Sequence, residues 1–248
     1  MMDPLGLLYK YASLFRKMIS AKVWSSERSI KELLSLNSEA DWDFLTSAMD
    51  IVDDGSAAIG HVMKYGLRGP TKYDDLGEKY LRLYGLLSAT YIQQQSIGTI
   101  YKLMNLPDPK QLRATFETLE IRGLRHKLSS HGTDLLDRAT GTQQAFVPLR
   151  LNLNDGLSVT YVNYTASSMH HHVDLAAAID AHVKMMIDVM DSIIEKSMTT
   201  IFEKSSKQKA EIASELDDLR IEKAGGWVSK TEAGPKLIVT FVDAESER

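Results

Sequence analysis

An apolar stripe between residues 76 and 104 constrains the fold of this chain more than any other feature of its sequence. Apolar side chains recur there at spacings of three and four residues, which is the period of one face of an α-helix. A similar stripe runs from about residue 173 to 204. The stripes contain Leu76, Tyr80, Leu83, Leu87 and Tyr91 in the first, and Ile179, Val183, Met186, Val189, Met190 and Ile194 in the second. They predict a helical bundle with a long two-helix core.

Another helix is predicted between about residues 110 and 130, after the prolines Pro107 and Pro109 have ended the first long helix. The polar stretch Gln93-Gln94-Gln95 interrupts the first stripe. We expect an ordinary solvated face there, and the alternative is that these glutamines reach a functional site.

The pattern changes after residue 145. Apolar residues then alternate with polar ones, as in a half-buried strand: Val147, Leu149, Leu151, Leu153, Val159 and Tyr161. With Asn154-Asp155-Gly156 as its loop, this segment predicts a β-hairpin over about 146–164, and Pro148 makes the first strand an edge strand. A short C-terminal strand is predicted at about 237–243.

The expected fold class is therefore mainly α, with a hairpin and a short strand added to the bundle. We expect a helical domain over residues 1–145. The hairpin, second long helix and C-terminal strand, residues 146–248, are expected to pack on it as one unit.

Composition excludes several classes of site. The 248 residues include no cysteine, which removes disulfides, thiolate metal sites and cysteine nucleophiles. No glycine-rich phosphate loop occurs, so nucleotide-dependent transferases are poor candidates, and we expect no cofactor. The N-terminus lacks a basic leader, and no apolar run reaches the ~18–20 residues of a membrane span. We therefore expect a cytoplasmic protein with no membrane partner.

The triplet His170-His171-His172, with Asp174 and His182 nearby, invites a metal hypothesis. Neighbouring residues of a helix point about 100° apart, so three consecutive histidines cannot all reach one ion. We expect a solvated helix start here and no metal site. A metal-dependent enzyme remains a third, weaker alternative.

The stretch 121-IRGLRHKLSSHGTD-134 reverses the acidic balance of the chain. Its net charge is −4 overall, yet five basic and two acidic residues lie between Lys110 and His131. A histidine can transfer a proton near neutral pH, and an arginine can hold a phosphate and its developing charge. These groups suit metal-independent RNA cleavage. The alternative is a basic helix face without chemistry.

Helix geometry separates the candidate pairs of this stretch. On a straight α-helix Arg125 and His131 lie about 240° apart, whereas Arg122 and His126 lie about 40° apart. Arg125 and His131 therefore converge only if the helix ends or distorts near residues 129–132, or if two chains contribute.

The stretch Arg125-His126-Lys-Leu-Ser-Ser-His131 resembles the Arg-x(4–6)-His signature of HEPN domains. The resemblance covers about residues 50–140. It implies a helical bundle that dimerises with the two motifs facing each other, and a metal-independent endoribonuclease of toxin–antitoxin or phage-defence systems. His126 stands where the family often has asparagine.

The resemblance assigns Arg125 to hold the phosphate and His131 to act as general acid and base. Arg122 and His126 are expected to position groups or contact RNA, while Lys127 and Ser129 are further substrate-binding candidates. The expected partners are RNA, a second copy of the chain and a cognate protein. The competing hypothesis is a non-catalytic helical interaction protein.

Overall fold

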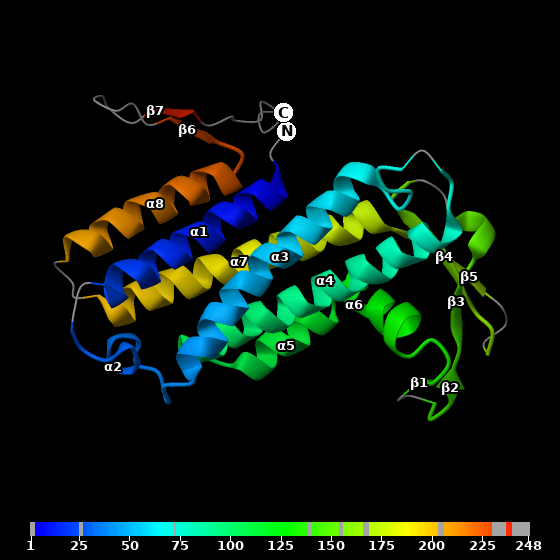
Figure 1. Cartoon of the computed structure of the whole chain (residues 1–248), viewed down its shortest axis with the longest axis horizontal. Coiled ribbons are helices and arrows are strands. Elements are labelled where there is room, and N and C mark those ends of the chain that lie inside the picture. Colours follow the sequence, from blue (N-terminus) through cyan, green and yellow to red (C-terminus); the bar gives the residue numbers. More distant parts are fainter. Residues whose placement is uncertain are drawn as a thin grey trace, which may run out of the picture. The chain divides into compact units, whose positions relative to one another are not determined.

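The chain is mainly helical, as its sequence predicts (Figure 1). A computed structural model describes residues 3–24, 27–71, 73–137, 140–153, 156–165, 169–202, 206–229 and 237–239. Within these ranges, no helix is long and apolar enough to cross a membrane. The α-helices are α1 (Pro4–Val23), α2 (Ile30–Leu34), α3 (Asp41–Tyr65), α4 (Leu76–Leu103), α5 (Pro109–Glu117), α6 (Glu120–Leu124), α7 (Leu175–Ile201) and α8 (Lys207–Lys223).

The chain forms two compact units. A terminal unit contains residues 1–43 and 187–248, and a central unit contains residues 44–186. Helix α7 gives its first part to the central unit and the rest to the terminal unit. The chain passes from one unit to the other after residues 43 and 186. The domain boundary predicted at residue 145 stays a prediction.

Helix α1 begins as its first residues require. The Asp3 side chain accepts a hydrogen bond from the backbone N–H of Leu5 at 3.1 Å, and Pro4 occupies the first helical position. Its buried side chains include Leu8, Tyr11 and Phe15. These side chains form part of the core of the terminal unit, where α1 packs against α8.

A buried carboxylate joins the three long helices of the terminal unit. Asp191 of α7 accepts a hydrogen bond from the Tyr11 hydroxyl of α1 at 3.0 Å. Arg220 of α8 donates to the same carboxylate through Nη2 at 2.6 Å and Nε at 3.0 Å. Burial acts to raise the pKa of Asp191, but the hydrogen bonds from Arg220 and Tyr11 outweigh it and hold that pKa below its usual value.

The first apolar stripe of the sequence forms α4, which contacts α3 and α7 in the central unit. Gly55 of α3 faces Gln93 of α4, where an added methyl group would lie only 3.2 Å from the Gln93 Cβ. The expectation of a solvated glutamine face is wrong for Gln93 and Gln94, which are 0% and 1% exposed. Of the three glutamines only Gln95 is exposed, because at this level α4 contacts α3 on one side and α7 on the other.

The single helix predicted for residues 110–130 is broken in the structure. Helix α5 ends at Glu117, Leu119 is extended, and α6 begins at Glu120. The Thr118 hydroxyl donates to the Thr115 carbonyl at 2.7 Å, a local bond by which a threonine competes with the helix. After α6 the backbone forms a π-turn over Arg125–Ser130.

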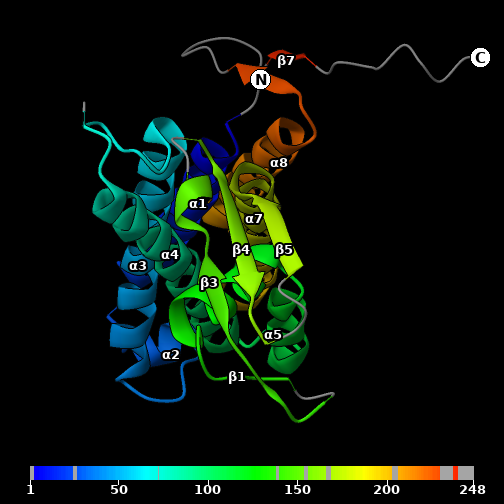
Figure 2. The same cartoon turned by 90° about the vertical axis from the view of Figure 1, so that its right-hand side faces the viewer.

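The predicted hairpin exists as part of a three-stranded antiparallel sheet (Figure 2). Strand β3 (Phe146–Pro148) pairs with β4 (Ser158–Asn163), and β4 pairs with β5 (Met169–Asp174). Pro148 lies in an edge strand, as predicted.

The buried positions of the first strand do not follow the alternation of its apolar residues. Phe146 and Pro148 are buried, whereas Val147 is 39% exposed and Leu151 is 99% exposed. The strand ends after Pro148, and a 3₁₀ turn at Arg150–Asn152 breaks the alternation. Residues 154 and 155 of the predicted loop lie outside the described residues.

Strand β5 also corrects the interpretation of the histidine triplet. His170, His171 and His172 lie in this strand and not at a helix start, and α7 begins only at Leu175. The remaining strands are β1 (Leu135–Leu136), β2 (Gln143–Gln144), β6 (Trp227–Ser229) and β7 (Leu237–Val239). Strand β7 confirms the predicted C-terminal strand over 237–239, and residues 240–243 lie outside the described residues.

We expect replacement of Asp191 by alanine to destabilise the protein by about 1.5–3 kcal/mol, because Arg220 and Tyr11 both lose a charged acceptor. Urea unfolding at pH 7 measures this loss. Asp188→Ala on the same helix is the control, because Asp188 pairs with the partly exposed Lys223 and a smaller loss is expected.

The stability contributed by Asp191 is present at neutral pH, because its folded pKa is lowered, and it is lost as the pH falls through that pKa. The difference between wild type and Asp191→Ala should therefore shrink on acidification. A difference that grows on acidification contradicts this account.

Candidate functional site

The basic motif of the sequence forms a π-turn. The backbone N–H of His131 donates to the carbonyl of His126 at 2.9 Å, a bond between residues five apart. An α-helix would join residues four apart, and single π-turns are rare features that often lie at functional sites.

The π-turn brings two imidazoles together. The rings of His126 and His131 are nearly parallel, with 6.4 Å between their centroids and 21° between their planes. The sequence left open whether the helix distorts near residues 129–132, and it does. The distortion pairs His131 with His126, whereas the Arg125 guanidinium lies against a different ring.

Glu117 at the end of α5 holds the first imidazole. Its Oε2 is 3.3 Å from Nε2 of His126, and its Oε1 accepts from Nη2 of Arg122 at 2.7 Å. Burial lowers the pKa of His126, and Arg122 and Arg125 lower it further, while the carboxylate of Glu117 opposes them. His126 is therefore neutral at pH 7.

Asp134 holds the second imidazole. Its Oδ1 is 3.3 Å from Nδ1 of His131. The side chain of His131 is 48% exposed and lines a cleft. Neither Glu117 nor Asp134 was singled out in the sequence, because a signature read along one helix gives no reason to look at the preceding helix or the following turn.

Arg122 is buried, with 5% of its side chain exposed. Its Nη1 donates to Oε1 of Gln94 at 3.0 Å, and its guanidinium lies 4.4 Å from the centroid of the Tyr91 ring. Of the two roles expected for Arg122, this placement favours positioning over RNA contact.

The side chains of Arg125 and Lys127 also contact other side chains of the same chain. The Arg125 guanidinium lies 3.7 Å from the centroid of Tyr91, a cation–π contact. Lys127 donates to the hydroxyl of Tyr161 on β4 at 2.9 Å. Ser129 is exposed at the outer side of the turn.

An open cleft of about 640 Å³ lies where these elements meet. It is lined by Glu117, His126, His131, Asp134, Leu135 and Leu136. The cleft therefore holds two imidazoles, each beside its own carboxylate, with an apolar wall from β1. Two proton-transfer groups side by side suit general acid–base chemistry.

The alternative metal site is not assembled. In the parts of the chain that the structure describes, no three histidine, aspartate or glutamate residues group as metal ligands. In β5 the ring of His171 stacks on Tyr161 with 4.9 Å between centroids. Nδ1 of His172 lies 3.1 Å from the hydroxyl of Thr160.

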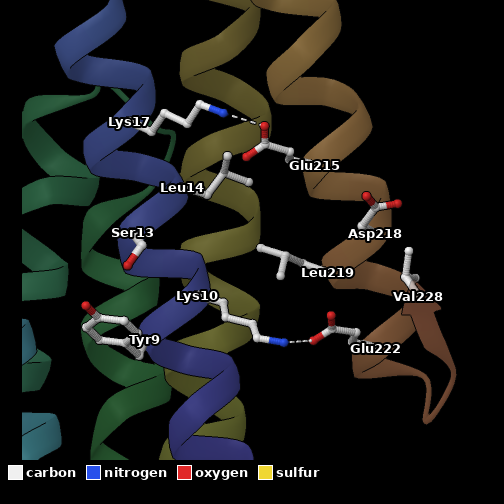
Figure 3. A pocket seen from close by; sticks show the side chains of 10 residues that line it. All are labelled: Tyr9, Lys10, Ser13, Leu14, Lys17, Glu215, Asp218, Leu219, Glu222 and Val228. Carbon is white, nitrogen blue, oxygen red and sulfur yellow. Dashed lines mark hydrogen bonds and ion pairs between the residues drawn. The ribbon is translucent and has the colours of Figure 1, made fainter. Parts of the chain in front are cut away.

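A second groove, of about 520 Å³, lies between α1 and α8 in the terminal unit (Figure 3). Lys10 pairs with Glu222 at 2.6 Å across this groove, and Lys17 pairs with Glu215. Leu14 and Leu219 lie between the two ion pairs. Four of its charged side chains form ion pairs that hold the two helices together, and none of its described lining residues is a histidine. We therefore do not assign chemistry to this groove.

No protein-family model, curated protein or solved structure matches this chain. The resemblance to HEPN domains therefore rests on the residues of the motif. The chemistry of the cleft has to be argued from its own atoms.

We expect Glu117→Gln to lower the pKa of His126 further, because the carboxylate is the charge that stabilises the imidazolium form. An NMR titration of the imidazole measures this directly. Glu120→Gln is the matched control, since Glu120 is exposed on the next helix and should leave the titration unchanged. A rise in the pKa of His126 in Glu117→Gln contradicts the assigned contact.

Proposed function

We propose that this protein is a HEPN-like, metal-independent endoribonuclease that acts as a homodimer. The observation that carries the proposal is the pair of imidazoles, His126 and His131, brought together by the π-turn and each held by a carboxylate. The open cleft gives an RNA strand access to both rings. The Arg-x5-His signature supports RNA as the substrate class.

The geometry suits cleavage by the 2′-hydroxyl of RNA. With Nε2–H of His126 donated to Glu117, Nδ1 carries the lone pair and takes the proton from the 2′-hydroxyl. The 2′-oxygen attacks the adjacent phosphorus, and the bond from phosphorus to the 5′-oxygen breaks. His131, whose Nδ1 faces Asp134, gives a proton from Nε2 to that leaving oxygen, leaving a 2′,3′-cyclic phosphate.

Arg125 is the candidate for holding the phosphate. Its guanidinium is fixed on the face of Tyr91, and the planar fork of an arginine matches two phosphate oxygens. Lys127 adds positive charge, and the exposed hydroxyl of Ser129 can donate a hydrogen bond. Arg122 acts through Glu117 and does not touch the substrate.

A non-catalytic interaction protein is the second candidate. The observation that favours it is the use of the basic side chains within the protein: Arg122 pairs with Glu117, Arg125 lies on Tyr91, and Lys127 is bonded to Tyr161. In that case the motif stabilises the central unit, and a cognate protein takes the place of RNA as the partner.

We expect the purified protein to cleave single-stranded RNA in the presence of EDTA. His126→Ala, His131→Ala and Arg125→Ala should each reduce the rate by roughly 10²–10⁴-fold, because each loses a proton-transfer or charge-stabilising group. His170→Ala is the control, since this exposed histidine of β5 is outside the cleft and should cleave like wild type. Equal activity in wild type and all variants rejects the catalytic proposal.

We expect the full-length protein to sediment as a homodimer at micromolar concentration. Analytical ultracentrifugation of wild type and Arg125→Ala measures the mass of the assembly separately from its activity. A wild-type protein that cleaves RNA as a monomer contradicts the proposed homodimer and leaves the site within one chain in place.

A further inference from the structure

A row of buried hydrogen bonds extends from the cleft into the core of the central unit. Gln93 and Gln94 of α4 and His182 of α7 are 0%, 1% and 0% exposed. Nε2 of His182 is 2.8 Å from Oε1 of Gln93, and Nδ1 of His182 is 3.2 Å from Nε2 of Gln94. The histidine therefore bridges two neighbouring glutamines.

The inner end of this row is fixed by a backbone carbonyl. Nε2 of Gln93 donates to the carbonyl of Val52 at 2.9 Å and lies 2.9 Å from the hydroxyl of Ser56. A carbonyl only accepts, so the Gln93 amide nitrogen must point to α3 and Oε1 must point to His182. His182 then carries its proton on Nε2, and burial lowers its pKa to about 3, which keeps it neutral.

The outer end is fixed by a guanidinium. With its proton on Nε2, His182 accepts at Nδ1, so Gln94 must donate to it through Nε2. Oε1 of Gln94 then faces Nη1 of Arg122 at 3.0 Å, and an arginine only donates. A single assignment of donors and acceptors thus satisfies every group between Val52 and Arg122.

From Arg122 the row reaches the cleft. Nη2 of Arg122 donates to Oε1 of Glu117 at 2.7 Å, and Oε2 of Glu117 is 3.3 Å from Nε2 of His126. Rotation of the Gln94 amide would bring its NH₂ group against the guanidinium, two donors facing each other. The imidazole of His182 and the guanidinium of Arg122 together hold the Gln94 amide in this orientation.

We propose that His182 is a positioning residue for the cleft: through Gln94 and Arg122 it fixes the carboxylate of Glu117 beside His126. Its importance for catalysis rests on the proposed ribonuclease function, whereas the coupling between the core and His126 does not. Three helices, α3, α4 and α7, are thereby used to place one carboxylate of the site.

His182→Leu in the full-length chain tests the coupling, because leucine fills the space but neither donates nor accepts. Glu117 is the group that raises the pKa of His126, so a carboxylate no longer fixed beside the ring should let that pKa fall further. The other charged or titratable groups that face His126 are Arg122, Arg125 and His131, and all three are kept in this variant. NMR titration of the His126 imidazole is the measurement.

Three further variants complete the test. His182→Gln offers an NH₂ donor to Gln93 and a carbonyl acceptor to Gln94, so its His126 should titrate as in wild type. Gln94→Met breaks the row on another helix and should act like His182→Leu, even if the latter folds poorly. Val183→Ala removes buried atoms next to His182 without touching the row, and should leave His126 unchanged.

A double variant separates the row from general loosening of the core. Arg122→Met should raise the pKa of His126, and adding His182→Leu should then cause no further change, because the connection is already broken. If Arg122→Met shifts the titration and neither His182→Leu nor Gln94→Met does, the positioning role is rejected.

Cleavage of RNA by the same samples distinguishes the two proposals. A shifted titration without cleavage in any sample, wild type included, supports the positioning role and rejects the ribonuclease. Cleavage by wild type with an unchanged titration in His182→Leu and Gln94→Met rejects the positioning role and leaves the ribonuclease in place.

Discussion

The candidate site depends on one hydrogen bond, from the backbone N–H of His131 to the carbonyl of His126. This bond closes a π-turn, and the turn places the two imidazoles 6.4 Å apart. In a regular α-helix, residues five apart differ by about 140° around the axis and their side chains diverge. The same amino acids in a straight helix would form a basic face. The local change of hydrogen-bond register is what brings the two imidazoles side by side.

The turn is supported from both sides. Toward the core, Arg122 donates a hydrogen bond to Glu117. Arg122 is itself held by a row of buried polar groups that ends at the carbonyl of Val52 in α3. Toward the sheet, Lys127 is bonded to Tyr161, and the backbone N–H of Phe146 donates to the carbonyl of Gly132 at 2.6 Å. Such support matters for catalysis because groups already in place need not reorganise during the reaction. The open cleft lies beside both histidines.

The long helices were predictable because a sustained period of three and four residues dominates any local preference. Helix α4 was expected over about residues 76–104 and lies at Leu76–Leu103. The π-turn was not predictable, because a shift of one hydrogen bond leaves no periodic signal in six residues. Gln93 and Gln94 were misjudged because glutamine is usually exposed, and their partner His182 lies 88 or more residues away. The motif named His126 and His131, whereas Glu117 and Asp134, which lie beside these histidines in the cleft, came only from the structure.

The pH dependence of RNA cleavage in EDTA tests the central claim most directly. If a neutral His126 takes one proton while a protonated His131 gives another, the rate falls on both sides of an optimum. His126→Ala should remove the fall on the acidic side, and His131→Ala should remove the fall on the basic side, each at a much lower rate. A wild-type protein that shows no cleavage at any pH, or whose rate passes unchanged through the range in which histidines titrate, contradicts the account.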